Sequence, residues 1–444
     1  MAISTELWRQ YGRLDEAPVP DEVWRWASHC VLDWYGVSVL GSTEPLSLLL
    51  REEYAASTGP CSIIGTDRTA DPGTAALLGG AAAHAIDFDD SNKAGGGHHP
   101  GAPVIPVAYA IAQAEHRSGA EFLAAVVAGY EFAYAIGEAL GAGIFRKGWH
   151  PTLALGVFGA LAAAGSLLRL DEREFGNAFG IAASLSGGLQ ANFGTMAKPL
   201  HAGLAAQSGI TAARLGRRGV TANPEALEAM GGLAELMGDG TIHRDLLDAA
   251  RGGWVITRNI FKVHASCLGT HAPIEATRKA AAGLRAEDVE RVVVRVHPLS
   301  RRICRFDRPE TGLQAKFSIQ ATTAMALLGD DLADPATFSD ARVREPDFAA
   351  MLARVELRPD DGMISQHALV EIDTRDGRRL EGHHDSSIPA SDLDVQERRL
   401  LQKFLANTAP VLGAGTAAFA DRLLRVRSED DVAALVPEPL AAAR

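Results

Sequence analysis

The sequence predicts a mostly α-helical protein with a smaller inserted α+β domain. Apolar residues recur at helical spacing over the first 260 or so positions, which are rich in alanine and glycine. Between about residues 287 and 384 the pattern changes to β-branched and alternating stretches, and after residue 392 it becomes helical again. We therefore expect a large all-helical domain, residues 1–265 and 394–444, interrupted by an α+β domain, residues 266–393.

The helical elements can be placed in order along the chain. A first helix opens at Pro20-Asp21, because Val23, Ala27 and Trp34 recur at helical spacing. The pattern predicts further helices over 74–86, 103–115, 121–140, 152–168, 172–185, 202–217 and 224–230. Several are apolar on all sides and rich in small residues, so we expect a compact bundle with central buried helices.

The β-rich part follows the same logic. The valine-rich stretch 289–296 predicts a strand, and residues 354–358 alternate in the manner of another. Stretches 367–373 and 378–383 are joined by Arg375-Asp376-Gly377, which predicts a hairpin. Helices are expected between these strands, over 314–328 and 340–352. Beyond Asp392 the expected helices cover 399–404 and 416–424.

Composition excludes several classes of protein. The 444 residues are 47% hydrophobic and 22% charged, so the chain can bury a large core and is not disordered. The net charge of −12 argues against a nucleic-acid binder. We expect no membrane span, because the longest apolar run, 153–168, is broken by glycines and Ser166. The amino terminus lacks the apolar core of a signal peptide, and we expect a cytoplasmic protein.

The four cysteines are Cys30, Cys61, Cys267 and Cys304. They are widely scattered, as in a reduced protein, and no two have metal-ligand spacing. The sequence therefore predicts neither a disulfide framework nor a metal site.

Chemistry-bearing residues gather first between two apolar helices, in residues 84–100. This loop combines Asp87, Asp89 and Asp90 with Lys93 and a histidine pair. Ionisable groups between buried elements are costly unless they are paired or used. The alternative is a hinge loop in which Asp90 or Ser91 caps a helix and the glycines supply flexibility.

Further polar residues begin two helices. His150 precedes an apolar helix, where the helix dipole favours the neutral imidazole that can act as a base. Lys198 and His201 are three apart and share a face of the first turn of another helix. Taken alone, His150 is more typical of a satisfied surface histidine, and Lys198 and His201 are equally compatible with a solvated helix start.

Two more segments lie at the start of the predicted α+β domain and within it. Lys262, His264 and Cys267 fall where the two domains join, a favoured place for clefts, and Lys316 follows in the smaller domain. On its own, Cys267 is more typical of a packed thiol than of a nucleophile. The chain holds only 7 lysines among 43 basic residues, and most of them fall in or beside these segments. That placement predicts a compact cationic pocket.

Together and in this order, the segments resemble the MmgE/PrpD family, which includes 2-methylcitrate dehydratase, cis-aconitate decarboxylase and iminodisuccinate epimerase. The motifs that carry the resemblance are His84-Ala-Ile-Asp-Phe-Asp-Asp90, His99-Pro-Gly-Ala-Pro-Val-Ile-Pro106, Phe193-Gly-Thr-Met-Ala-Lys-Pro-Leu-His-Ala-Gly203 and Thr311-Gly-Leu-Gln-Ala-Lys-Phe-Ser318. The resemblance implies a helical domain with an α+β lid domain in a homodimer. It also implies catalysis without metal or cofactor on small polycarboxylates, in a pocket between the domains.

Matched by motif, the resemblance implies that Asp87, Ser91, His99, His150 and Lys198 line that pocket. Lys262 matches a further pocket lysine. Two positions depart from the decarboxylase pattern: Cys267 replaces a histidine, and Ala321 or Gln320 replaces a tyrosine. These departures weigh against cis-aconitate decarboxylation.

We therefore predict a metal-free lyase that removes a proton next to a carboxylate and then eliminates water. Its predicted catalytic residues are His99 and His150 as acid and base, Lys198 as electrostatic clamp and Asp87 as the group that orients a histidine. Predicted substrate-binding residues are Asp90, Ser91, Lys93, His98, His201, Lys262, His264, Cys267 and Lys316. An epimerase or isomerase, a decarboxylase and a catalytically silent binding protein are the alternatives.

Overall fold

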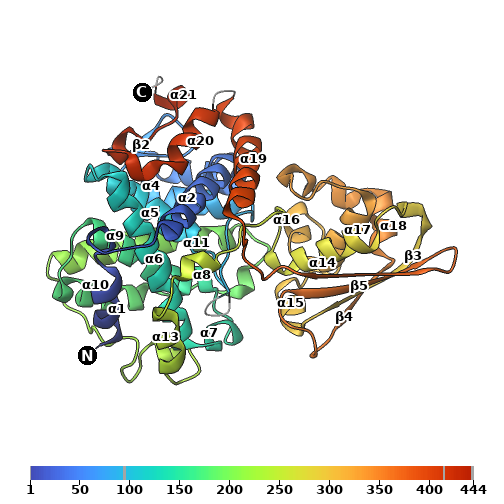
Figure 1. The fold of residues 1–444 in the computed structure, drawn as a ribbon, viewed down its shortest axis with the longest axis horizontal. Helices are drawn as coiled ribbons and strands as arrows, with labels where there is room; N and C mark the ends of the chain where they lie inside the picture. Colours follow the sequence, from blue (N-terminus) through green and yellow to red (C-terminus); the bar gives the residue numbers. More distant parts are fainter. Residues whose placement is uncertain (1, 94–96, 414–415, 442–444) are drawn as a thin grey trace.

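The computed structural model describes residues 2–93, 97–413 and 416–441 and shows a mostly α-helical chain, as predicted. Most helices form one large body, and a smaller group of helices and strands projects from it (Figure 1). We call this smaller group, from α14 to β6, the α+β unit. The main helices of the body are α2 (Asp21–Gly41), α4 (Pro72–Ala85), α5 (Gly101–Ala114), α6 (Gly119–Leu140), α9 (Gly156–Leu167), α10 (Glu172–Leu185), α11 (Ala197–Arg217), α19 (Leu393–Leu412) and α20 (Thr416–Leu424).

Shorter elements complete the body. They are α1 (Ile3–Tyr11), α3 (Pro45–Glu53), α7 (Gly143–Arg146), α8 (Pro151–Ala154), α12 (Leu233–Leu236), α13 (Arg244–Arg251), α21 (Glu438–Ala441) and the strands β1 (Cys61–Ser62) and β2 (Thr69–Ala70). The helices α1 and α3 are not among the predicted elements. The helix predicted over 224–230 is wrong, because these residues form turns. The stretch begins at Pro224 and is followed by Gly231 and Gly232. The helix predicted over 152–168 is divided at Leu155 into α8 and α9.

Small residues allow the central helices to approach closely. Helix α11 packs along α4, and a side chain at Gly203 would lie 2.4 Å from the Leu77 carbonyl oxygen. Between α6 and α9, side chains at Gly129 and Gly159 would each come within 2.8 Å of the other's carbonyl oxygen. Such distances exclude a Cβ atom, so glycine at these positions permits the contacts. The close α4–α11 contact brings the end of α4 beside the start of α11, where the candidate site lies.

The α+β unit contains α14 (Leu268–Ala280), β3 (Val289–Val296), α15 (Pro298–Ile303), α16 (Gly312–Ala315), α17 (Ile319–Leu328), α18 (Pro346–Leu352), β4 (Val355–Pro359), β5 (His367–Thr374) and β6 (Arg379–Asp385). The four strands form one sheet in the order β4-β3-β5-β6, in which only the β3–β4 pair is parallel. Alternate residues of β5 are buried, and α14 packs on the sheet. The hairpin predicted at Arg375-Asp376-Gly377 joins β5 to β6.

Helix α6 carries a run of apolar residues that is long enough to cross a membrane. Its most apolar 18-residue window has a mean hydropathy of 1.3, but 89% of that window is buried inside the protein. Among the described helices it alone meets the length and composition test. The expectation that no apolar stretch reaches this length is therefore wrong for α6, and its burial is typical of a core helix.

The chain returns from the α+β unit to the body through α19, which packs against α2 (Figure 1). Lys403 on α19 forms a 2.7 Å ion pair with Asp33 on α2, and both side chains are largely buried. The same ammonium group donates hydrogen bonds to the carbonyl oxygens of Phe88, at 2.6 Å, and Lys262, at 3.1 Å. This lysine therefore joins the returning helix to two segments that border the candidate site.

We predict that Lys403→Met destabilises the protein by about 3–5 kcal/mol, because it leaves the Asp33 carboxylate buried without its counter-charge. Thermal and urea unfolding followed by circular dichroism measure the change. The double variant Asp33→Asn/Lys403→Met removes both charges and recovers part of the loss. Unfolding of Lys403→Met at the wild-type midpoint would contradict the structural role of the pair.

Candidate active site

The loop that follows α4 holds the acidic residues of the site. Asp87 has a φ of 55°, in the left-handed region that few residues other than glycine adopt. A backbone conformation of this kind costs free energy and persists only where surrounding contacts hold it, as they often do at functional sites. Asp87 is 3% exposed, and residues 86 to 92 are all buried. The loop therefore needs internal partners for its charges and its backbone.

Lysine side chains supply those partners. The ammonium group of Lys316 donates to the carbonyl oxygen of residue 86 at 2.7 Å. Lys262 donates to that of residue 87 at 3.0 Å, and Lys403 to that of residue 88 at 2.6 Å. Lys316 belongs to the α+β unit, Lys262 to the segment that leads into it and Lys403 to α19. Three consecutive carbonyl groups at the carboxyl end of α4 thus face ammonium groups, which the helix dipole also favours there.

The carboxylate of Asp87 lies between two of the lysines. Lys198, in the first turn of α11, donates to Oδ2 at 2.9 Å, and Lys262 binds Oδ1 on the other side. Burial would raise the pKa of Asp87, but the two ammonium groups hold it well below its usual value. Burial likewise opposes the charge of Lys262, yet Asp87 and Asp89 raise its pKa. The three groups therefore form a charged array inside the protein.

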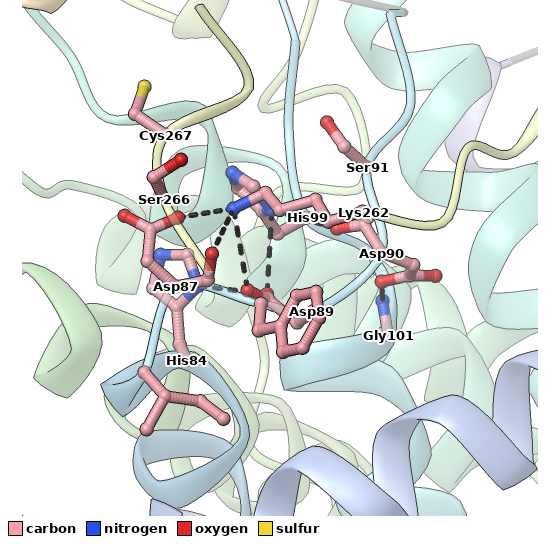
Figure 2. Close-up of polar contacts among 12 residues, drawn as sticks. His84, Asp87, Asp89, Asp90, Ser91, His99, Gly101, Lys262, Ser266 and Cys267 are labelled. Atoms are coloured by element: carbon pink, nitrogen blue, oxygen red, sulfur yellow. Dashed lines mark hydrogen bonds and ion pairs between the residues drawn. The ribbon is translucent and has the colours of Figure 1, made fainter. Parts of the chain in front are cut away.

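Histidines surround the neighbouring carboxylate. Asp89 Oδ2 lies 2.8 Å from His84 Nδ1 and 3.4 Å from His99 Nδ1 (Figure 2). The shorter contact of His99 Nδ1 is with the carbonyl oxygen of Asp90, at 2.7 Å, so in the neutral ring Nδ1 carries the proton. His99 Nε2 then holds a free lone pair. His84 Nε2 is free in the same way, but the His84 side chain is fully buried whereas that of His99 is 14% exposed, so His99 is the histidine of this group that a substrate can reach.

A second imidazole pair lies beside the first. His150 precedes α8 and its Nδ1 lies 2.9 Å from Nδ1 of His201 on α11, so one ring donates and the other accepts. The His150 ring stacks near His84 at 5.9 Å and meets Phe193 edge-on at 4.9 Å. Residues from three parts of the chain thus place His150 and His201 against the loop that bears Asp87.

Burial keeps these imidazoles neutral. It lowers the pKa of His84, and lowers those of His99 and His150 well below the usual histidine value, with nearby Lys198 adding to the effect. Burial also lowers the pKa of His201 to about 4. Neutral rings beside charged lysines can exchange protons with a bound anion without first losing one of their own.

The side chains of His84, Asp89 and His99 include three metal-type ligand atoms within 4.8 Å of one another. The Lys262 ammonium group is 3.8 Å from Asp89 Oδ1, and His99 Nδ1 already donates to a carbonyl oxygen. A metal ion would have to displace a lysine and reverse that hydrogen bond. The arrangement fits a hydrogen-bonded array better than a metal centre.

Asp90 points away from this cluster. Its Oδ2 accepts hydrogen bonds from Tyr130 and Asn259, both at 2.6 Å, and its Oδ1 accepts one from the backbone N–H of Gly101 at 3.0 Å. Burial raises the pKa of Asp90 to about 7. This residue, which was predicted to bind substrate, instead ties the loop to α5, α6 and the 259–264 segment.

Four other predicted substrate-binding residues lie apart from the cluster. Lys93 is exposed and interacts with Asp385, and residues 94–96 of the same motif lie outside the described part of the chain. Ser91 Oγ donates to the carbonyl oxygen of His98, whose backbone pairs with that of Asn92. His264 Nε2 lies 2.8 Å from Glu275, on the far side of the 260–264 segment. Substrate binding by these four residues therefore stays a prediction.

The other predicted residues come together. Asp87, His99, His150, Lys198, His201, Lys262 and Lys316 share the buried cluster, and the Cys267 side chain lies above Asp87 (Figure 2). Sequence reasoning assigned no role to Lys403, Asn259 or Tyr130. Of these, Lys403 carried one signal: it is among the few lysines of an arginine-rich chain.

Two clefts border the cluster. A cleft of about 910 Å³ is lined by residues 259–264, α14, the connection after β6 and α19, and includes Lys262 and Lys403. A smaller one, of about 400 Å³, lies against Phe193 and is flanked by Arg302 and Arg305. Asp87, His99 and Lys198 line neither cleft, and the larger cleft reaches the cluster through Lys262 and Lys403.

Buried acids, lysines and neutral imidazoles that meet where two structural units join have the architecture of an enzyme active site. The N-terminal domain of the MmgE/PrpD family matches residues 12–244, and its C-terminal domain matches residues 264–425. The chain therefore belongs to the MmgE/PrpD family of enzymes, as the sequence motifs indicate.

Named relatives are cis-aconitate decarboxylases or resemble them. The human cis-aconitate decarboxylase is 28% identical over 417 residues, which cover 89% of this chain and 85% of the relative. The cis-aconitate decarboxylase-like protein oryM of Aspergillus oryzae is 30% identical over 300 residues, or 62% of this chain, and the match spans only 61% of its length. The mouse cis-aconitate decarboxylase is 27% identical over 88% of this chain and 84% of its own.

We predict that acid destabilises the protein partly through its buried imidazoles. Between about pH 6.5, where histidines of the unfolded chain take up protons, and the value of about 4 at which folded His201 does, the unfolded state binds more protons. The free energy of unfolding therefore falls as the pH falls through this window. The fall in unfolding temperature should be smaller for His201→Asn than for wild type, and equal falls would contradict the neutral ring.

Proposed function

We propose that the protein is a lyase that acts on a small di- or tricarboxylate by moving a proton on carbon next to a carboxylate. The observation that supports this most is the Lys198–Asp87–Lys262 array with four neutral imidazoles beside it. Fixed ammonium groups stabilise the negative charge that develops when such a proton is removed. Neutral imidazoles supply the acid and base.

Lys198 is the group we assign to the substrate carboxylate. Among the described residues its ammonium group donates to Asp87 alone, which leaves two of its three N–H donors for a ligand. Its charge is also held over the rings of Phe317 and Phe193, at 5.0 and 5.9 Å. A carboxylate bound here would lie against the imidazoles of the 84–99 loop and α11.

His99 is the base and the His150–His201 pair the acid in this proposal. His99 Nε2 takes the proton from carbon, and the electron pair moves toward the substrate carboxylate as an enediolate near Lys198. The His150–His201 pair then protonates the leaving hydroxyl group, which departs as water while the carbon–carbon double bond forms. Asp89 orients His99 through the loop, and Asp87 fixes the two lysines, in place of the histidine-orienting role first predicted for it.

Decarboxylation of a related acid is the second candidate, and the named relatives favour it. In that reaction carbon dioxide leaves with the carboxyl carbon, the electron pair stays on the α-carbon and a histidine protonates it. Elimination of water remains our first choice because Cys267 and Ala321 replace the decarboxylase histidine and tyrosine implied by the motif comparison. The homodimer, the cytoplasmic location and the lid function of the α+β unit stay predictions.

We expect Lys198→Ala to weaken binding of cis-aconitate or citrate by about 1.5–3 kcal/mol, because a charged hydrogen bond is lost. Titration calorimetry measures the change. Lys147→Ala is the matched control, since the Lys147 ammonium group is exposed and donates to the carbonyl oxygen of Glu235. Unchanged affinity in Lys198→Ala would support a catalytically silent binding protein instead.

The reaction is distinguished by proton NMR in deuterated buffer over citrate-like, aconitate-like and aminodicarboxylate acids. An alkene signal shows dehydration, carbon dioxide release shows decarboxylation, and deuterium uptake without a new product shows epimerisation. We expect dehydration, with turnover lost in folded His99→Gln and His150→Gln variants. No turnover and no exchange with any acid would contradict the polycarboxylate assignment.

A further inference from the structure

Two cysteines, Cys267 just before the α+β unit and Cys304 within it, lie next to each other beside the active site. A side chain placed at Gly269 would lie 3.1 Å from the sulfur of Cys304 and 3.9 Å from that of Cys267. The Cys304 thiol donates a hydrogen bond to the Cys267 sulfur. Both residues are buried and neither is in a disulfide. The proposed reaction uses neither of these two thiols.

Cys267 is also part of the framework of the site. It immediately precedes α14, a helix of 13 residues, and its backbone N–H donates to the carbonyl oxygen of Lys316 at 3.0 Å. The side chain lies above Asp87 and next to Ser266 (Figure 2). Its sulfur interacts with the charges of Asp87, Lys198 and Lys262. A change in the bonding of this sulfur therefore acts directly on the charged array.

The two thiols differ in character. The hydrogen bond from Cys304 lowers the pKa of Cys267, and the lysine charges add to this against burial. The same hydrogen bond and burial raise the pKa of Cys304 well above its usual value. For the other two cysteines burial dominates: it raises the pKa of Cys61 to about 12 and holds that of Cys30 well above its usual value, although Tyr130 and Asn259 donate to the Cys30 sulfur. Among the four cysteines, Cys267 alone has a lowered pKa.

We propose that Cys267 and Cys304 are a redox-active dithiol that hydrogen peroxide converts to a disulfide, and that this oxidation turns the neighbouring active site off. Disulfide formation is a property of the thiol pair itself. Only the effect on turnover rests on the proposed function.

The chemistry has two steps. The Cys267 thiolate attacks one peroxide oxygen, a sulfur–oxygen bond forms, the oxygen–oxygen bond breaks, and hydroxide leaves and is protonated to water. Cys304 then gives up its proton and attacks the sulfur of the sulfenic acid, so that a sulfur–sulfur bond forms and a second water leaves. The two thiols lose two electrons and two protons, and the peroxide is reduced to two waters.

The disulfide displaces the site because it shortens the sulfur–sulfur separation. A disulfide bond is about 2.05 Å long, well inside the separation of two hydrogen-bonded thiols. Closing that gap moves residue 267, and with it the 266–267 backbone that contacts Lys316. It also shifts the Cys267 sulfur relative to Lys198 and Lys262, with whose charges it interacts. Displacements of about 1 Å in an active site cost up to about 100-fold in rate.

Formation of the bond is tested on the full-length wild-type protein with hydrogen peroxide, without any substrate. Alkylation after unfolding and peptide mass spectrometry should show a Cys267–Cys304 peptide that has lost two hydrogen atoms, while Cys30 and Cys61 remain alkylated. Dithiothreitol should reverse the change. Oxidation of Cys267 that stops at sulfinic acid, or equal modification of all four cysteines, would overturn the proposal.

The switch itself is tested by turnover before and after oxidation. We expect a loss of about tenfold or more in wild type that dithiothreitol restores. Cys304→Ser should keep its basal turnover and lose the dithiothreitol-reversible response, whereas Cys61→Ser, the matched control, should respond as wild type does. A disulfide that forms in full with turnover unchanged would overturn the switch alone, and absence of turnover in every sample would instead contradict the proposed function.

Discussion

The structure depends on burying a polar loop, residues 86–92, in the middle of an apolar helical body. Backbone carbonyl groups at the end of α4 and the carboxylates of Asp87 and Asp89 would each be costly there without donors. Lysine ammonium groups provide the donors. Each brings several N–H groups on a long flexible stem, so a single side chain reaches both a carbonyl oxygen and a carboxylate, as Lys262 does at Asp87.

These lysines come from separate parts of the chain, so the loop connects the helical body to the α+β unit and to the returning helix. Lys198 comes from α11, Lys262 from the segment entering the α+β unit, Lys316 from within that unit and Lys403 from the helix that leaves it. The loop therefore reaches its observed state only when the α+β unit and the returning helix are both docked. Buried ion pairs of this kind add little net stability compared with apolar packing, but losing one partner is costly. Assembly of the site and docking of the unit are thus one event.

The pattern of the sequence predicts the fold class and much of this cluster. Helical periodicity identified the long body helices because their burial is set by local spacing, and the rarity of lysine pointed to Lys198, Lys262 and Lys316. Lys403 was missed because its partners lie 141 to 370 residues away, and nothing near it in sequence marks a site. Lys93 shares the motif with the cluster residues but is exposed, and the carboxylate that acts on its charge is that of Asp385.

The prediction of short elements failed for a different reason. Residues 224–230 contain good helix formers, yet turns form there, since the neighbouring proline and glycines decide the backbone. The division of 152–168 at Leu155 separates α8, which positions His150, from the core helix α9. The apolar spacing continues unchanged across this break, so the sequence pattern does not predict it. At the break itself, Ser186 Oγ donates a hydrogen bond to the carbonyl oxygen of Ala154.

The charges of the cluster explain how a chain of net charge −12 can receive an anion. Among the described residues of the cluster, the four ammonium groups face the carboxylates of Asp33, Asp87 and Asp89, and the imidazoles are neutral. One positive charge is therefore in excess while the Asp90 carboxyl, whose pKa burial raises to about 7, is protonated. Burial lowers the pKa of Lys316 to about 8, so this excess is present near neutral pH and shrinks in mild alkali. A small anion restores the balance locally, whereas a polyanion would meet the acidic surface, and this difference selects for small acids.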